Sequence, residues 1–128
     1  MDIYLSVPMI ANRTLERARL MAKAITDSGH TIASPWVLGP LETGKSGVDV
    51  FQRDKKAAEE SDAIVADVTE PSIGVGMELM AAYIAGKKII LVAKRGKPVS
   101  AMLTRMDRKE TVEYDSEDEI YPALRRLL

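Results

Sequence analysis

Apolar residues along this chain occur in two patterns, as short unbroken runs and as stretches in which every third or fourth residue is apolar. The clearest run lies in Asp62 to Val68, where four apolar residues follow one another directly. Such a run has no polar face, which is typical of a strand in a parallel sheet covered by helices on both sides. The clearest stretch with helical spacing is Leu15 to Ile25, whose apolar residues fall on one face.

The two patterns alternate along the chain. Strands are predicted at Ile3–Val7, Thr31–Ser34, Asp62–Val68, Lys88–Ala93 and Thr111–Tyr114. Helices are predicted from a cap at Asn12 to Ser28, at Val50–Glu60, Gly76–Ala85 and Val99–Met106, and from a capping box of Ser116 and Glu119 to Leu128. Because strand and helix alternate five times, we predict one α/β domain over residues 1–128, a three-layer sandwich with a five-stranded parallel sheet of the Rossmann or flavodoxin-like kind.

The composition argues against nucleic-acid partners and against catalytic or metal sites built on cysteine. The chain has 128 residues, 46% of them hydrophobic, with 18 Lys and Arg against 19 Asp and Glu, for a net charge of -1. Without a basic excess, we expect no nucleic-acid polymer as a partner. With no Cys and a single His, thiolate zinc sites, disulfides and cysteine nucleophiles are excluded.

The first residues argue against a signal peptide, and the first loop argues against an NAD-binding site. Met1–Ile10 has neither a positively charged start nor a long apolar core, so we expect the first strand of a cytoplasmic protein with no membrane partner. The following segment, Val7–Arg13, contains no glycine, which disfavours NAD binding, and the chain has no phosphate-loop motif of the NTPase type. We therefore expect neither a cofactor nor a metal.

One carboxylate is the leading candidate for chemistry. Gly74 and Gly76 follow the third predicted strand and lack a Cβ, so the backbone can turn sharply there and a ligand can approach it closely. Glu78 then falls in the first turn of the predicted helix, where the helix dipole favours an ionised carboxylate. An alternative stays open, in which the glycines only pack the helix against the strand and Glu78 only complements the dipole.

Four segments are predicted to meet at one edge of the sheet, because the loops that leave parallel strands at their carboxyl ends lie together. Those segments are Tyr4–Ile10, Trp36, Ser72–Glu78 and Ser100–Met102. The long loop Pro35–Gly47, which contains several glycines and a proline, is predicted to form a lid or a substrate wall.

Asp54 and Ser100 each have a plainer interpretation. Asp54 stands in a charge run with Arg53, Lys55 and Lys56, and by itself such a run indicates a solvated helix face. Ser100 by itself indicates an ordinary helix start.

At these residues the chain resembles the nucleoside 2-deoxyribosyltransferase superfamily, and within it the Rcl-type 2'-deoxynucleoside 5'-monophosphate N-hydrolases. The resemblance spans about Asp2 to Arg105, and its most specific segments are Asp62–Leu79 and Val99–Met102. It implies a single nucleoside 2-deoxyribosyltransferase-like domain that forms a homodimer. It also implies hydrolysis of 2'-deoxynucleoside 5'-monophosphates to free base and 2-deoxyribose 5-phosphate.

The resemblance implies three catalytic residues. Glu78 corresponds to the nucleophile, Asp54 to the general acid/base, and Tyr4 to a tyrosine that helps to hold the nucleophile and the sugar. These residue types suit the reaction, because cleaving an N-glycosidic bond builds positive charge on C1' and releases a base that needs a proton. A covalent deoxyribosyl intermediate on Glu78, resolved by water, is the expected course.

The resemblance also implies a set of substrate contacts. Ser72 and Ser100 correspond to serines that contact the 5'-phosphate, and Ser100–Met102 is contributed to the partner's site in the dimer. Trp36 corresponds to a position that lines the base site. The remaining implied substrate-binding residues are Ser6, Pro8, Met9, Ile10, Gly74, Gly76, Ala101 and Met102.

Two segments indicate whether the chain is more similar to the hydrolase branch or to the transferase branch of this superfamily. Hydrolases of this type usually carry a glycine- and arginine-rich first loop, whereas Ser6–Arg13 has no glycine and reaches an arginine only at its end. The transferase branch has an acidic segment where this chain has Thr69–Ser72, so the phosphate-accepting branch fits better. Base exchange by a nucleoside 2-deoxyribosyltransferase is the nearest alternative. A non-catalytic nucleotide-binding module is another, and it would not need both Glu78 and Asp54.

Overall fold

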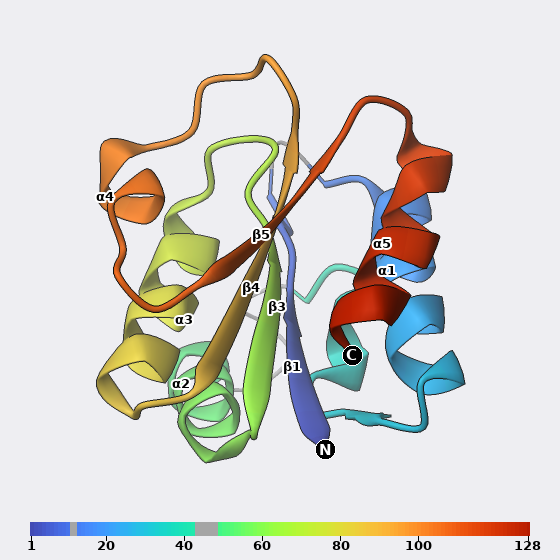
Figure 1. The fold of residues 1–128 in the computed structure, drawn as a ribbon. Coiled ribbons are helices and arrows are strands. Elements are labelled where there is room, and N and C mark those ends of the chain that lie inside the picture. The colour runs from blue at the N-terminus through green and yellow to red at the C-terminus, as the bar shows by residue number, and fades with distance from the viewer. Residues whose placement is uncertain (11–12, 43–48) are drawn as a thin grey trace.

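The computed structural model describes residues 1–10, 13–42 and 49–128. Its strands are β1 (Asp2–Ser6), β2 (Thr31–Ile32), β3 (Ala63–Asp67), β4 (Lys88–Lys94) and β5 (Glu110–Tyr114). They form one five-stranded parallel sheet in the order β2-β1-β3-β4-β5, as Figure 1 shows. This is the flavodoxin-like order, and the predicted parallel sheet is confirmed.

Helices cover both faces of the sheet. They are α1 (Leu15–Asp27), α2 (Val50–Glu60), α3 (Ile73–Ile84), α4 (Ala101–Thr104) and α5 (Ile120–Leu127), with short 3-10 helices η1 (Pro35–Leu38) and η2 (Glu117–Glu119). α1 packs against α5 on one face and α2 packs against α3 on the other, so the predicted three-layer sandwich is confirmed (Figure 1). None of the helices in the described ranges has the length and apolar character needed to cross a bilayer.

The core consists of two layers of apolar side chains, one on each face of the sheet. β3 is buried along its whole length, as its unbroken apolar run predicts. In β1, Ile3 and Leu5 pack toward α1 and α5, whereas Tyr4 packs toward α2 and α3. Because side chains alternate along a strand, Ser6 points to the same side as Tyr4. β1 therefore presents two hydroxyl groups to the α2 and α3 layer.

Several predicted boundaries need correction. β2 ends at Ile32 rather than Ser34, because the Ser34 hydroxyl takes over the pairing: it accepts from Leu5 N at 2.9 Å and donates to Leu5 O at 2.8 Å. The cap of α1 is Thr14, and Asn12, the predicted cap, lies outside the described residues.

The chain after β4 also differs in detail from the prediction. α4 is shorter than the predicted helix Val99–Met106, because Ser100 caps it and the chain leaves the helix after Thr104. The capping box of Ser116 and Glu119 is confirmed, with Glu119 Oε1 accepting from Ser116 N at 3.3 Å. The box opens η2, which leads directly into α5. Pro122 lies in the first turn of α5, where a missing N–H costs no helical hydrogen bond.

Candidate active site

The start of α3 differs from the sequence-based expectation. α3 begins at Ile73, and Ser72 is its N-cap, with Ser72 Oγ accepting from Val75 N at 3.3 Å. Gly74 and Gly76 therefore lie inside the helix, and neither has a positive φ. The predicted glycine turn is wrong. Each glycine costs the helix about 1 kcal/mol, but the Ser72 cap and the packing of the apolar face of α3 on the sheet outweigh that cost.

Glu78 is the sixth residue of α3 and so lies beyond the first turn in which it was expected. Its side chain points to β1, where both carboxylate oxygens accept hydrogen bonds. Glu78 Oε1 accepts from Ser6 Oγ at 2.8 Å, and Glu78 Oε2 accepts a short hydrogen bond from the Tyr4 hydroxyl. The two hydroxyls, two residues apart on one strand, thus fix the orientation of the carboxylate.

Burial controls the charge state of Glu78. Removal from water raises the pKa of the Glu78 carboxyl to about 7, and the hydrogen bonds from Tyr4 and Ser6 lower that pKa only in part. The negative charge of Asp54 also contributes to the raised pKa. The expectation that the helix dipole keeps Glu78 ionised is therefore wrong, because Glu78 sits beyond the first turn and is largely buried. Near neutral pH the protonated and ionised forms coexist.

Tyr4 is a hydrogen-bond donor to Glu78 throughout the ordinary pH range. It is fully buried, and burial together with the negative charge of Glu78 raises the pKa of its phenol far above the usual value. Its ring meets Trp36 edge to face, with centroids 6.4 Å apart and an interplanar angle of 66°. Tyr4 therefore connects the carboxylate to the aromatic residue that was predicted to line the base site.

Asp54 shares a cavity with Glu78. The cavity has a volume of about 610 Å³ and lies between α2 and α3, with Phe51, Gly74 and Met77 also in its walls. Only 20% of the Asp54 side chain is exposed, whereas its neighbours Lys55 and Lys56 are exposed. The solvated-face interpretation of the charge run thus fits the lysines but does not fit Asp54.

Trp36, in η1, is covered by a charged side chain. The Arg53 guanidinium lies 4.1 Å from the centre of the Trp36 ring. Arg53 also donates to Asp54 Oδ1 at 2.8 Å and to Glu42 Oε2 at 2.7 Å, and its hydrogen bond lowers the pKa of the Glu42 carboxyl. The part of the loop Pro35–Gly47 beyond Glu42, which was predicted to form a lid, lies outside the described residues.

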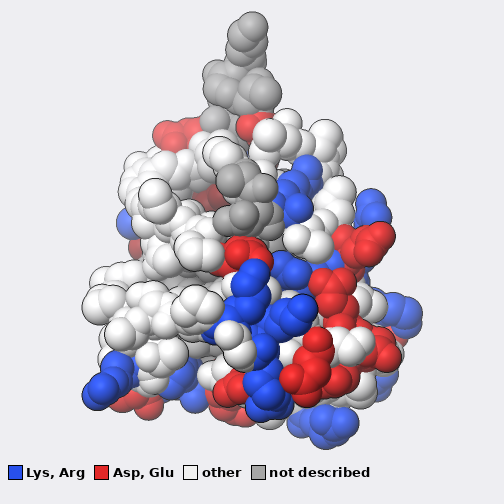
Figure 2. All heavy atoms as spheres, turned by 90° about the horizontal axis from the view of Figure 1, so that it is seen from above, with Lys and Arg blue, Asp and Glu red and all other residues white. Residues whose placement is uncertain are grey.

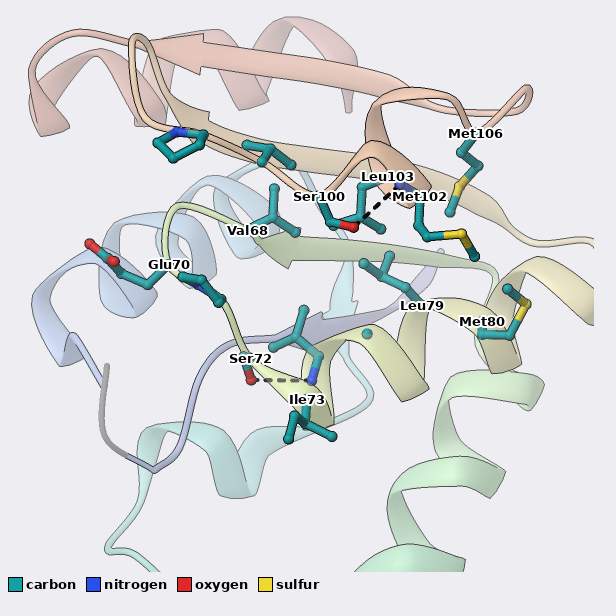
Figure 3. A pocket seen from close by; sticks show the side chains of 15 residues that line it. Val68, Glu70, Ser72, Ile73, Leu79, Met80, Ser100, Met102, Leu103 and Met106 are labelled. Carbon is teal, nitrogen blue, oxygen red and sulfur yellow. Dashed lines mark hydrogen bonds between the residues drawn. The ribbon is translucent and has the colours of Figure 1, made fainter.

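Ser72 and Ser100 line a second cavity, on the other side of α3. This cavity has a volume of about 460 Å³ and mostly apolar walls, which include Val68, Leu79 and Leu103. Figure 3 shows that the two serines come from the starts of α3 and α4 and that each hydroxyl accepts a backbone N–H of its own helix. Both serines are therefore helix caps, as the plain interpretation of Ser100 predicts.

The other residues predicted to contact the substrate lie in different places: in the two cavities, in the core and on the surface. Gly74 lines the Glu78 cavity and Gly76 lines the serine cavity. Pro8 is buried, Met9 packs against the core layer beside α1, and Ile10 is exposed. Ala101 and Met102 are exposed on α4, beside Met80. The structure thus brings Tyr4, Ser6, Asp54 and Glu78 together, but it does not bring all predicted contacts to one cavity.

Arg53 is the residue that sequence reasoning missed. The charge run concealed it, because a lysine or arginine beside an acidic residue on a helix is common. Its contact with Trp36 joins residues far apart in the sequence, and no local spacing reports such a contact. Across residues 1–10, 13–42 and 49–128, no group of three or more His, Cys, Asp or Glu side chains could hold a metal ion.

The surface beside α3 is unusually apolar. Seen from above the carboxyl edge of the sheet, one side of the molecule is largely uncharged, whereas acidic and basic side chains mix on the other (Figure 2). The exposed apolar residues on this side include Ile73, Met77, Met80 and Ile84 of α3 and Met102 of α4. The four residues of α3 recur at helical spacing, so they form one exposed stripe.

Comparison with known sequences finds relatives that are named N-hydrolases. No family model matches the chain. A protein of Thermofilum pendens, named a 2'-deoxynucleoside 5'-phosphate N-hydrolase, is 32% identical over an alignment that covers 100% of this chain and 95% of the relative. The 5-hydroxymethyl-dUMP N-hydrolase of Rattus norvegicus is 35% identical and is matched over 71% of this chain and 56% of its own length.

Solved structures share the fold at lower identity. The CMP N-glycosidase BcmB of Clostridium botulinum superposes with a TM-score of 0.74 at 19% identity, covering 100% of both chains. A 2-deoxyribosyltransferase of Bacillus psychrosaccharolyticus superposes with a TM-score of 0.70 at 22% identity, covering 94% of this chain and 90% of that one. At these identities the superpositions establish the fold.

Proposed function

The chain belongs to the family of 2'-deoxynucleoside 5'-phosphate N-hydrolases, and on that premise we propose that it hydrolyses the N-glycosidic bond of 2'-deoxynucleoside 5'-monophosphates to free base and 2-deoxyribose 5-phosphate. The observation that carries the proposal is the Glu78 cavity. It contains two carboxylates, Glu78 and Asp54, and the first of them is oriented by the hydroxyls of Tyr4 and Ser6. A cavity built only to bind a nucleotide would not need this pair.

The reaction proceeds in two displacements. In the first, the ionised Glu78 carboxylate attacks C1', the bond from C1' to the base breaks, and the departing base nitrogen takes a proton from Asp54. In the second, water attacks C1', its proton passes to Asp54, and the bond to Glu78 breaks. The positive charge that develops on C1' forms more easily in a 2'-deoxy sugar, because the electron-withdrawing 2'-hydroxyl is missing.

The raised pKa of the Glu78 carboxyl makes the rate of this mechanism depend on pH. Only the ionised carboxylate can attack, and the pKa of Glu78 is about 7. The rate at low substrate concentration therefore rises with pH through neutrality as Glu78 ionises. The hydrogen bonds of Tyr4 and Ser6 favour the ionised form, so both hydroxyls keep the nucleophile usable at neutral pH.

The serine cavity is our candidate for the 5'-phosphate. Ser72 stands at the N-terminus of α3, where the backbone N–H groups and the helix dipole favour an anion. Ser100 of the same chain also lines this cavity, at the start of α4, and in the dimer we expect Ser100 of the partner subunit to contact the phosphate. A hydroxyl that accepts a capping hydrogen bond still has a proton to donate, so a cap can also serve a phosphate oxygen.

A second copy of the chain is our candidate for covering the apolar stripe of α3. Ile73 is 86% exposed and Ile84 is 77% exposed, at the two ends of the same helix. Exposed apolar patches of this kind mark interaction surfaces. Met102 continues the patch onto α4, so a homodimer through this face would bring Ser100–Met102 toward the partner's site.

Product analysis tests the function directly. The protein is incubated with each of the four 2'-deoxynucleoside 5'-monophosphates, and the mixture is separated to detect free base and 2-deoxyribose 5-phosphate. We expect both products in equal amounts, with water as the acceptor even in the presence of excess free base. Efficient exchange of one base for another would favour a transferase. Nucleotide binding without any cleavage would favour a binding module.

A further inference from the structure

Arg53 makes three different contacts with one guanidinium group. Its Nε donates to Asp54 Oδ1 at 2.8 Å, its Nη1 donates to Glu42 Oε2 at 2.7 Å, and its Cζ lies 4.1 Å from the Trp36 ring centre. A planar, forked donor can make such contacts together, whereas a lysine cannot. Arg53 therefore joins the proposed general acid to the aromatic wall.

These contacts are shielded from solvent to a degree that ordinary surface ion pairs are not. The exposed side-chain fractions are 24% for Arg53, 20% for Asp54 and 25% for Glu42. For comparison, the neighbouring pair of Lys55 and Glu59 on the same helix is 47% and 37% exposed. Shielding strengthens the hydrogen bonds and the stacking, so the Arg53 side chain is held rather than free to sample solvent.

The Arg53 guanidinium covers the face of the Trp36 ring, on which an aromatic ligand would stack. The rings of Trp36 and Tyr4 meet edge to face, and Trp36 Nε1 is buried with no hydrogen-bond acceptor among the residues that the structure describes. Arg53 covers the face of the ring. Flat cations and nucleobases stack on the same surface of an indole, so the two compete for it.

We propose that Arg53 is a positioning residue, which holds Asp54 at the Glu78 cavity in the ligand-free protein and leaves the face of Trp36 when the base of the substrate stacks there. This proposal rests on the proposed function. The Nε of Arg53 keeps its hydrogen bond to Asp54 Oδ1 while the rest of the guanidinium moves off the ring. Asp54 is therefore still held at the Glu78 cavity when the base arrives.

The chain contains a single tryptophan, so its fluorescence reports directly on Trp36. We would compare Glu78→Gln protein, which cannot turn over, with the double variant Glu78→Gln and Arg53→Met. The ligand-free spectra should differ, because one ring is covered by a cation and the other is not. At saturation with a 2'-deoxynucleoside 5'-monophosphate the two spectra should coincide, because the base occupies the ring in both proteins.

Two spectral results would overturn the proposal. Coincident ligand-free spectra would show that Arg53 does not stack on Trp36. Spectra that still differ at saturation, as far as they did without ligand, would show that Arg53 stays on the ring when the base binds. Failure of the proposed function looks different, because then the wild-type protein would release no base from any of the nucleotides.

Kinetics separate positioning from mere structural support. For Arg53→Met in an otherwise native chain, kcat should fall on the order of tenfold to a hundredfold, because Asp54 is no longer held in place. KM should stay level or fall, because the Trp36 face is open. Lys56→Met removes a positive charge from an exposed position of the same helix and should leave both constants unchanged. Equal kinetics in the two variants, or a rise in KM together with a lower melting temperature in Arg53→Met, would contradict the proposal.

Discussion

The two cavities that flank α3 use their polar groups in opposite ways. In the Glu78 cavity, the hydroxyls of Tyr4 and Ser6 both donate to one carboxylate, and a second carboxylate faces the same space. In the serine cavity, the hydroxyls of Ser72 and Ser100 accept backbone N–H groups of their own helices, and most of the remaining wall is apolar.

This difference indicates which part of the site a single chain can complete. The carboxylate pair stands on α2 and α3, which pack on each other, and its hydroxyl donors stand on β1, which packs on α3, so the pair is preorganised for chemistry. The serine cavity opens beside an exposed apolar stripe and contains few polar groups. We therefore expect the Glu78 cavity to set the rate of the chemical step, and the serine cavity to act on the phosphate with help from a second copy.

The largest expected effect is in the Glu78 cavity. Glu78→Gln keeps the shape of the side chain but removes the nucleophile, so kcat should fall by roughly 10⁴-fold or more. Nucleotide binding, measured by Trp36 fluorescence, should persist. Glu60→Gln, which alters an exposed carboxylate at the end of α2, is the matched control and should be fully active. Turnover near the wild-type value in Glu78→Gln would refute the assignment of the nucleophile.

The second effect separates the two carboxylates. Asp54→Asn should lower kcat on the order of a hundredfold, which is the usual loss for a general acid. The loss should be smaller for substrates whose base is a better leaving group, because such a base needs less protonation. A change in melting temperature alone, with unchanged kcat, would mean that Asp54 is only part of a solvated charge run and takes no part in catalysis.

A third test concerns the serine cavity and the dimer. Ser100→Ala should lower the rate about tenfold, the cost of losing a hydrogen bond to a charged group. Inactive Glu78→Ala chains mixed with Ser100→Ala chains should regain up to about a quarter of wild-type activity, because half of randomly mixed dimers are heterodimers with one intact site. If heterodimers form without any recovery, Ser100 acts in its own subunit or outside the site.

The smallest effect is a shift along the pH axis. In the wild-type protein, kcat/KM should rise with pH through about 7, the pKa of Glu78. Tyr4→Phe removes a hydrogen bond that lowers this pKa, so the rise should move to higher pH. The loss at pH 7 should be less than about tenfold, because one unit of pKa changes the ionised fraction at most tenfold. A profile that stays in place would exclude Tyr4 from tuning Glu78.

The fold followed from local patterns more completely than the site did. The unbroken run of β3 and the ends of α2 at Val50 and Glu60 are as predicted, because burial on two faces and helix propensity are local signals. The start of α3 was misplaced, because Ser72 was assigned to a turn rather than to a cap. The glycines after it then seemed to end a loop, although they lie inside the helix.

The chemistry of the site depends on contacts that no local spacing contains. Glu78 was identified from its segment, but its raised pKa comes from burial beneath neighbouring elements, which is a tertiary property. In the folded chain, the alternation of side chains along β1 places Tyr4 and Ser6 on the same side of the sheet. The stacking of Arg53 on Trp36 joins α2 to η1, and this contact became visible only in the folded chain.

The stereochemistry at C1' tests the role of Glu78 most directly. In the presence of methanol, part of the 2-deoxyribose 5-phosphate is captured as a methyl glycoside, whose anomeric configuration is measured by proton NMR. Two displacements through Glu78 predict retention of the β configuration of the nucleotide. A product with the α configuration would mean that the solvent attacks C1' in a single displacement, and that Glu78 is not the nucleophile.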